Sequence, residues 1–214
     1  MQYTITPWSK RIFLLLTGLV IAHLGVTLFL QANLGSDPFN VFVQGLYRRI
    51  SALLPLTHGW VHMGISFLII LALLIVDRKY IRIGTLLCMV LGGPIIDGFT
   101  LLLGNVIHAE SPIVWRFLCL ALGCVILAFG MTIVINSEAG TGPNDLIAVV
   151  LSDKTGKKFG IVRVVVDVCF AVLGFLLGGT VGAGTLICAF LVGPLAQVFL
   201  PITAKLCLRV AMGR

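Results

Sequence analysis

The sequence is poor in charged residues, which make up 11% of its 214 positions, whereas 59% are hydrophobic. A soluble domain of this length needs far more polar surface. No mostly polar stretch exceeds about twenty residues, so the chain holds no sizeable soluble domain. Several apolar runs reach the roughly 18 residues that a membrane-spanning helix needs. The composition therefore predicts an all-α integral membrane protein.

Motifs of enzymes, metal sites and nucleic-acid binding are also absent. The sequence has no nucleophile elbow, Walker loop, zinc-ligand spacing or C-x-x-C. Its six cysteines lie within apolar runs, which favours small buried side chains over disulfides or metal ligands. The basic residues lie at the ends of apolar runs, where they indicate topology. We therefore expect no catalytic activity, no metal, no cofactor and no nucleic-acid partner.

What the sequence has instead is one polar segment that occurs twice. Residues 33–40 read Asn-Leu-Gly-Ser-Asp-Pro-Phe-Asn, and residues 138–145 read Glu-Ala-Gly-Thr-Gly-Pro-Asn-Asp. We call these segments the first and the second cassette. In each, a glycine permits a sharp turn, and a hydroxyl residue stands two positions before a proline, as at a helix start. Ser36 and Thr141 are thus the expected caps of two short helices.

The duplication extends well beyond the cassettes. Residues 18–38 match residues 123–143 at seven of 21 positions, and residues 84–94 match residues 184–194 at seven of 11. Glycines and prolines are among the matches, which chance alignment of apolar sequence does not produce easily. We predict two repeats joined by a linker, with the division 1–104, 105–113 and 114–214.

Each repeat is predicted to contain three membrane spans, with a short helix after the first span. The predicted spans are 12–31, 60–76, 83–103, 114–135, 159–177 and a sixth that ends near residue 204. The predicted short helices run from 38 to about 49 and from 143 to about 152. An odd number of spans inverts the second repeat relative to the first. We therefore expect six transmembrane helices in two inverted three-helix repeats, with re-entrant or interfacial half-helices.

The basic residues support this topology. With the N-terminus inside, twelve of the 15 basic residues fall on the cytoplasmic side and three outside, in line with the positive-inside rule. Full crossing of the short helices would place Arg48 and Arg49 inside a span, at high cost. The sequence thus predicts a multi-pass protein of the plasma (inner) membrane with both termini in the cytoplasm.

The cassettes and one membrane span hold the candidate substrate-binding residues. A helix N-terminus offers N–H groups and partial positive charge to an anion, although the hydroxyl residues could also do no more than cap interfacial helices. Within the fifth span, Arg163 and Asp167 share a helix face and can pair, either as a functional site or as an internal ion pair. The candidate residues are Asn33, Ser36, Asp37, Asn40, His62, Glu138, Thr141, Gly142, Asn144, Asp145, Arg163 and Asp167.

Three segments of the sequence resemble a known family. They are the pattern Asn33-x-Gly-Ser-x-Pro-x-Asn40, the segment Gly-Ile-Val-Arg-Val-Val-Val-Asp at 160–167, and the Gly-Thr-Leu…Gly-Pro-Leu block at 184–195. Together they resemble the YitT/YczE group of small bacterial membrane proteins, over nearly the whole chain. The resemblance implies a multi-span protein of the bacterial inner membrane.

Three functions are compatible with these features. The leading hypothesis is a transporter or permease for a small anionic or zwitterionic solute, bound near the midplane between two inverted repeats. The alternatives are a substrate-capture subunit that needs a separate energising partner, and a non-transporting membrane scaffold or sensor. The expected partners are the lipid bilayer and a small solute, and the sequence leaves open a homodimer or a partner membrane subunit.

Overall fold

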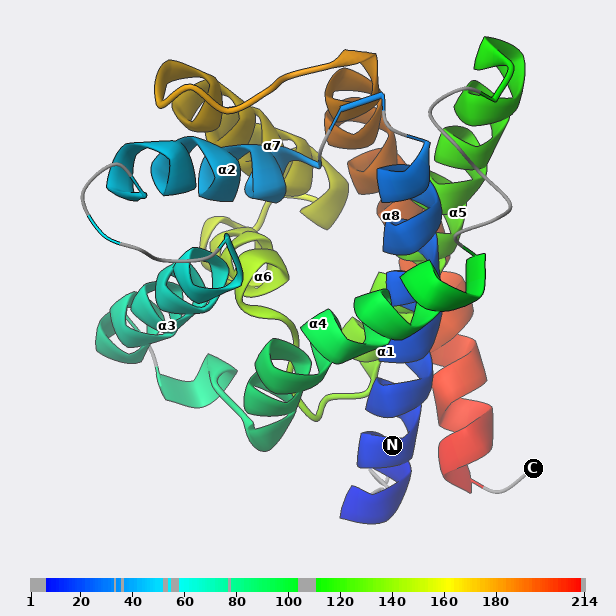
Figure 1. Cartoon of the computed structure of the whole chain (residues 1–214). Helices are drawn as coiled ribbons and strands as arrows, with labels where there is room; N and C mark the ends of the chain where they lie inside the picture. The colour runs from blue at the N-terminus through cyan, green and yellow to red at the C-terminus, as the bar shows by residue number, and fades with distance from the viewer. Residues whose placement is uncertain are drawn as a thin grey trace.

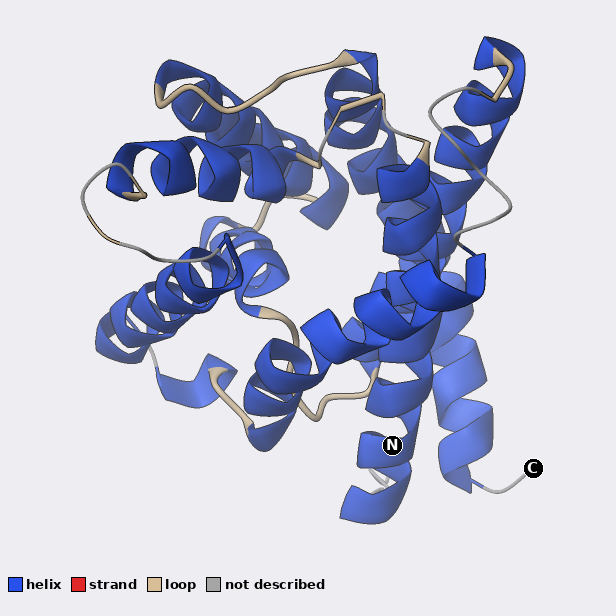
Figure 2. Ribbon diagram, in the orientation of Figure 1, coloured by secondary structure: helices blue, strands red, loops and turns tan. Residues whose placement is uncertain are grey.

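The computed structural model describes residues 7–32, 34–35, 37–51, 54, 58–76, 78–103 and 111–212. Within these ranges every regular element is a helix (Figure 2). The elements are α1 (Trp8–Gln31), α2 (Pro38–Ile50), α3 (His58–Val76), the short 3-10 helix η1 (Arg78–Tyr80), α4 (Ile83–Leu103), α5 (Ile113–Asn136), α6 (Pro143–Thr155), α7 (Phe159–Leu176) and α8 (Ala183–Met212). The predicted all-α fold class is confirmed. Most predicted bounds agree within a few residues, but α8 continues to Met212, beyond the predicted end of the sixth span near residue 204.

The outside of the molecule is strongly apolar. Ile75 is 89% exposed and Leu101 is 87% exposed, and large hydrophobic side chains are exposed on most of the other helices as well. Five helices, α1, α4, α5, α7 and α8, are long and apolar enough to cross a membrane, and α3 contributes a shorter apolar helix over Trp60–Val76. Apolar surface of this extent fits lipid hydrocarbon rather than water.

The central pair of helices, α1 and α5, runs antiparallel and packs through glycines (Figure 1). A Cβ added to Gly25 would lie 2.4 Å from the backbone N of Leu127, and one added to Gly130 would lie 2.3 Å from the backbone N of Ala22. Small residues allow such close backbone approach between membrane helices. Gly130 follows Gly25 by 105 positions, and Leu127 follows Ala22 by the same interval. Corresponding residues of the two halves therefore make the same contact twice.

Around this pair, α4 packs on α1 and α8 packs on α5, while α2, α3, α6 and α7 form a second group (Figure 1). The two groups are joined by α8, which also contacts α7. Glycine again brings α2 and α7 together, since a Cβ on Gly174 would lie 2.5 Å from the backbone N of Phe42. Next to it, the rings of Phe39 and Phe170 meet edge to face with centroids 5.3 Å apart. The short helix α2 is therefore firmly packed against α7.

The order of helices is the same in both halves. A long helix is followed by a helix of 13 residues that begins at a proline, and then by two further helices. The start of α1 and the end of α8 lie at the same end of the molecule, which we call the termini face (Figure 1). The junction of α1 with the first cassette lies at the other end, which we call the opposite face.

Candidate functional site

Each cassette is docked against the last helix of the other half. After α1, the carbonyl of Leu34 accepts a hydrogen bond from the N–H of Gly184 at the start of α8, at 2.8 Å. After α5, the carbonyl of Ala139 accepts one from the N–H of Gly84 at the start of α4, at 2.9 Å. These two bonds join corresponding residues. In each half, the cassette accepts a hydrogen bond from the last helix of the other half. The first cassette thus lies on the opposite face and the second on the termini face.

Glycine is required at the turn of both cassettes. Gly35 has a φ of 128° and Gly140 has a φ of 135°, a backbone conformation that other residues rarely adopt. A Cβ on Gly140 would lie 2.5 Å from the backbone N of Thr85, and one on Gly35 would lie 2.8 Å from Oγ1 of Thr185. The sharp turns that the sequence predicts are confirmed, and the φ angles of their two glycines are nearly the same.

The polar side chains of the first cassette bond to one another. Asp37, rather than the predicted Ser36, is the N-cap of α2, where its Oδ1 accepts a hydrogen bond from the backbone N of Asn40 at 3.2 Å. Its Oδ2 accepts a second bond from Nδ2 of Asn40 at 2.6 Å. Two of the predicted site residues, Asn33 and Ser36, lie outside the described residues. The described part of this cassette is a self-contained helix cap.

The second cassette lacks such a cap. Gly142 stands at the N-cap of α6 and offers no side chain to it, while Thr141 stands one residue earlier. Thr141 is only 4% exposed, and its Oγ1 has no hydrogen-bond partner among the described residues. The prediction that Thr141 caps its helix is therefore wrong, because Gly142 rather than Thr141 occupies the N-cap position of α6. A buried hydroxyl without a partner is uncommon and calls for an explanation.

Glu138, at the start of the second cassette, is exposed but held from two sides. Its carboxylate pairs with Arg11 of α1 at 3.3 Å, and its backbone carbonyl accepts a hydrogen bond from the guanidinium of Arg82. Its φ of 55° makes it a non-glycine residue in the left-handed region, which few side chains favour. These contacts tie the turn to the beginnings of α1 and α4.

Three charged side chains form a buried network beside this cassette. Nε of Arg163 donates to Oδ2 of Asp167 at 2.9 Å, and the same guanidinium donates to Oδ1 of Asp145 in the second cassette. Arg163 and Asp167 are 7% and 1% exposed, so the charges are largely removed from solvent. The predicted pairing of Arg163 with Asp167 is confirmed, whereas the third member, Asp145, was not predicted as their partner. We call these three residues the charged triad.

The corresponding place in the first half has no such charges. There, His62 and Ser66 of α3 stand where α7 has Arg163 and Asp167, and the ring of His62 meets the ring of Phe39 edge to face at 5.3 Å.

The predicted residues therefore divide into two groups. Asp145 of the second cassette is joined to the charges of α7, while Asp37 and Asn40 of the first cassette form no hydrogen bond with the charged triad in the described part of the chain. Asn144, half-buried, lies close to Gly142.

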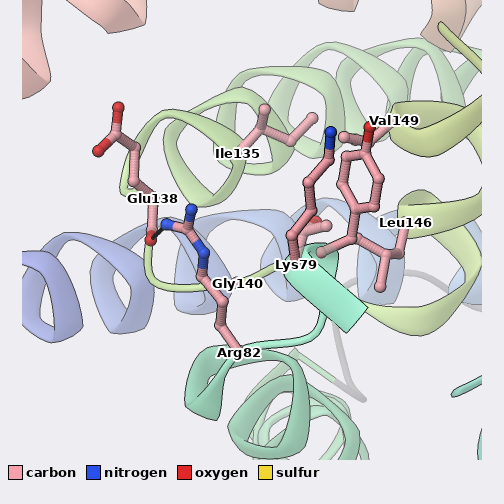
Figure 3. A pocket seen from close by; sticks show the side chains of 9 residues that line it. Lys79, Arg82, Ile135, Glu138, Gly140, Leu146 and Val149 are labelled. Carbon is pink, nitrogen blue, oxygen red and sulfur yellow. Dashed lines mark hydrogen bonds between the residues drawn. The ribbon is translucent and has the colours of Figure 1, made fainter. Parts of the chain in front are cut away.

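A pocket of about 250 Å³ lies between the second cassette and the α3–α4 connection (Figure 3). Its polar wall consists of Lys79, Tyr80, Arg82, Glu138 and Thr141, with the backbone of Gly140; its apolar wall consists of Ile135, Leu146 and Val149. From the sequence, the basic residues of this connection indicated topology only. The repeat in the sequence is the signal that could have placed them here. Gly84 corresponds to Gly184, which binds the first cassette, and Arg82 lies just before Gly84.

On the opposite face, the end of α2 is bonded to the α7–α8 connection. The guanidinium of Arg48 donates to the carbonyl of Gly178 and, at 3.1 Å, to Oγ1 of Thr180. Nε of the neighbouring Arg49 donates to the carbonyl of Leu177 at 3.3 Å. We call this set of contacts the α2 latch. It is made by two arginines that donate mostly to backbone carbonyls.

On the termini face, the end of α6 is bonded to the α3–α4 connection in the same way. The hydroxyl of Tyr80 donates to the carboxylate of Asp153, which raises the pKa of Tyr80, and Nζ of Lys79 lies 3.7 Å from the same carboxylate. Nζ of Lys154 donates to the carbonyl of Val76 at 3.5 Å. We call this set the α6 latch. Asp153 and Lys154 follow Arg48 and Arg49 by 105 positions, so the two latches are counterparts with different chemistry.

The helices, their apolar outside and the paired buried charges together define a multi-pass helical membrane protein. Residues 9–201 match a family described as "Family of unknown function (DUF6198)", and the chain belongs to this family. This family and the relatives that follow confirm the resemblance to the YczE group.

Three relatives illustrate the membership. The chain is 30% identical over 190 residues to the uncharacterized membrane protein YczE of Bacillus subtilis, covering 88% of this chain and 85% of the relative. It is 28% identical over 188 residues to the uncharacterized protein YyaS of the same organism, covering 88% and 91%. It is also 30% identical over 204 residues to an uncharacterized protein of Haemophilus influenzae, covering 94% and 88%. No solved structure matches the chain.

Proposed function

We propose that this protein is a transporter for a small anionic or zwitterionic solute, without catalytic activity. The observation that carries the proposal is the charged triad, in which Arg163 and Asp167 lie buried in α7 and bond to Asp145 of the second cassette. Buried charges in membrane helices are costly, and they commonly mark the path of a substrate or ion. A broken helix at the same place is the usual position of a transport site.

The proposed architecture is two inverted three-helix repeats in the bacterial plasma (inner) membrane. It is supported by the antiparallel packing of α1 and α5 and by the exchanged bonds of Leu34 with Gly184 and of Ala139 with Gly84. Contacts of this kind follow when two similar units are related by a two-fold axis in the membrane plane. The excess of basic residues on the termini face supports a cytoplasmic location for both termini.

In the proposed mechanism, Asp145 occupies the position on the Arg163 guanidinium that the anionic group of the solute takes when it binds. A guanidinium binds carboxylates through paired N–H groups, and Arg163 already donates to two carboxylates. The side chain of Asp167 is 1% exposed and that of Asp145 is 18% exposed, so Asp145 is the carboxylate that an incoming anionic group can replace. Because Asp145 belongs to the first turn of α6, its release would free the second cassette from α7.

The two latches would then act as the gates of alternating access. Each ties the end of a short helix to a connection on its own face, and neither is buried. Opening the α6 latch admits solute from the termini face, and opening the α2 latch admits it from the opposite face. Rocking of one repeat against the other about the α1–α5 contact would alternate the two states.

The test is solute uptake by the purified protein in liposomes, after a thermal-stability screen of the detergent-solubilised protein against small carboxylates, phosphates and amino acids. A solute that binds the folded state raises its melting temperature. We expect at least one such solute to be transported by the wild type, and Asp145→Asn and Arg163→Gln to abolish its transport. Arg209→Gln, at the exposed end of α8, serves as the control with unchanged uptake.

The proposal fails if the wild-type protein neither binds nor moves any solute of the screen while the protein remains folded. It also fails if a solute is transported equally well by Asp145→Asn and the wild type, because the triad is then not part of the transport site.

A further inference from the structure

The pocket on the termini face contains more positive than negative charge. Among the residues of its wall, Lys79 and Arg82 contribute two cations and Glu138 a single carboxylate, while Asp153, outside the wall, lies 3.7 Å from Nζ of Lys79. The carboxylate of Glu138 pairs with Arg11 at 3.3 Å, and in Figure 3 it points away from the side of the pocket on which Lys79 stands. The guanidinium of Arg82 donates to the backbone carbonyl of Glu138 and retains further N–H groups on the same fork. The electrostatics of this pocket therefore favour an anion.

Thr141 is a second and independent indication of a ligand. Its side chain forms part of the wall of the same pocket and is more than nine-tenths buried, yet its Oγ1 bonds to no described residue. Leaving a buried hydroxyl unsatisfied costs free energy that a bound acceptor would recover. The N-terminus of the 13-residue helix α6 follows directly, with Gly142 at its N-cap and no side chain bonded to its first N–H groups. That helix end adds partial positive charge beside the hydroxyl.

We propose that this pocket binds the phosphate group of a small organic phosphate. In our assignment, Lys79 and Arg82 neutralise the phosphate charge, and Thr141 donates its hydroxyl to a phosphate oxygen. Phosphate is favoured over a single carboxylate because three donors of different origin converge on one pocket, and a phosphate group presents three acceptor oxygens. The apolar wall that includes Leu146 and Val149 would contact the organic part. The inference rests on the proposed function, since it names the solute chemistry that a transporter would meet at this face.

The phosphate can come from a free solute or from a phospholipid headgroup, and the experiment separates the two. Delipidated protein in detergent is titrated with inorganic phosphate, with glycerol phosphate, and with short-chain phosphatidylglycerol, with short-chain phosphatidylcholine as the lipid control. The readouts are the melting temperature and the dissociation constant from calorimetry. Wild-type protein is expected to bind glycerol phosphate more tightly than inorganic phosphate, because only glycerol phosphate reaches the apolar wall. Tighter binding of phosphatidylglycerol than of glycerol phosphate would assign the site to a lipid.

The variants test the donor set. Arg82→Gln is expected to weaken glycerol phosphate binding at least tenfold, and Thr141→Val several-fold. Because Arg82 also supports the second cassette, Lys79→Gln provides a substitution at an exposed side chain that is expected to leave folding intact and to weaken binding several-fold. Arg209→Gln, at the exposed end of α8 and outside both the pocket and the latches, is the control and is expected to bind like the wild type.

The inference is overturned if the wild type binds none of the phosphate probes at millimolar concentration, or if Lys79→Gln and Thr141→Val bind them as the wild type does. It can fail separately from the proposed function. Phosphate binding without any transport in liposomes would contradict the transporter and leave the site standing. Transport of a solute without phosphate, in a protein that binds no phosphate probe, would contradict the site and leave the transporter standing.

Discussion

The two cassettes share a backbone but differ in what their side chains do. Both turn at a glycine with a φ near 130°, both dock through one backbone bond on a glycine of the other half, and both begin a 13-residue helix. In the first cassette Asp37 caps the helix and bonds to Asn40, so its described polar groups are satisfied locally. In the second, Asp145 reaches Arg163 in another helix, and Thr141 is left without a described partner.

The features that the two cassettes share serve the packing of the fold, whereas the features that differ serve its chemistry. The turn geometry is needed twice because both cassettes pack in the same way against a helix of the other half, so a glycine is required at each turn. The charges occur once, in the second cassette and α7, where the first half has His62 and Ser66 instead. The two halves thus share the framework of the turns, and the charges present in only one of them make the site asymmetric.

The largest effect is expected from removal of the cation of the charged triad. Arg163→Gln leaves Asp145 and Asp167 buried without their counter-charge, and breaking a buried pair in this way costs about 4 kcal/mol. The counterpart His62→Gln in the first half is expected to cost less than about 1.5 kcal/mol, because it leaves the charges of the triad paired. Melting temperatures of the two purified variants measure the difference. Equal destabilisation would show that the halves are not chemically distinct at this position.

Substitution of the turn glycines is expected to lower the stability less, and by similar amounts in the two halves. Gly35→Ala and Gly140→Ala force an unfavourable φ and bring a Cβ within 2.8 Å and 2.5 Å of neighbouring atoms, at a cost of about 3 kcal/mol each. Gly98→Ala, at a helical position with open space around the added Cβ, is the control and should not destabilise the protein. The melting temperatures of Gly35→Ala and Gly140→Ala are expected to fall by similar amounts. A large drop for only one of them would mean that the shared backbone matters in only one half.

The helix caps provide the next test. Asp37→Ala removes the side chain that caps α2 and is expected to cost about 1 kcal/mol. Gly142→Ser introduces a capping side chain in α6 at a φ of −58°, which any residue accepts, and is expected to gain a few tenths of a kcal/mol. Thermal denaturation in detergent measures both. Destabilisation by Gly142→Ser would indicate that the uncapped end of α6 is itself required for packing.

Substitutions in the latches are expected to have the smallest effect on stability and the largest effect on the accessibility of position 141. Asp153→Asn weakens the α6 latch and Arg48→Gln the α2 latch, each by less than about 1 kcal/mol because these groups are exposed. Even so, 1 kcal/mol changes a two-state ratio about fivefold. Asp153→Asn should therefore increase maleimide labelling of Thr141→Cys up to about fivefold, whereas Arg48→Gln should leave it unchanged or lower it. A Cys169→Ser background removes the exposed native thiol. Equal labelling in both latch variants would contradict the assignment of one gate to each face.

Much of the framework was predictable from the sequence because it depends on local and repeated signals. Apolar runs set the bounds of the long helices, and the Gly-x-x-Pro pattern placed the starts of α2 and α6. The i,i+4 spacing of Arg163 and Asp167 predicted their ion pair. The division of the chain into two repeats remains a prediction, since residues 105–110 of the predicted linker lie outside the described part.

What the sequence by itself determined is therefore the class of protein, the helices, the turns and the family. Only the tertiary structure decided that Asp145 completes the charged triad and that Lys79 and Arg82 face the second cassette across a pocket. The physical reason is that these neighbours come from segments separated by at least 18 positions along the chain, and no spacing rule along one helix joins them. Their proximity follows from the close packing of α6 on α7 and from the docking of the second cassette on α4, which are properties of the whole fold.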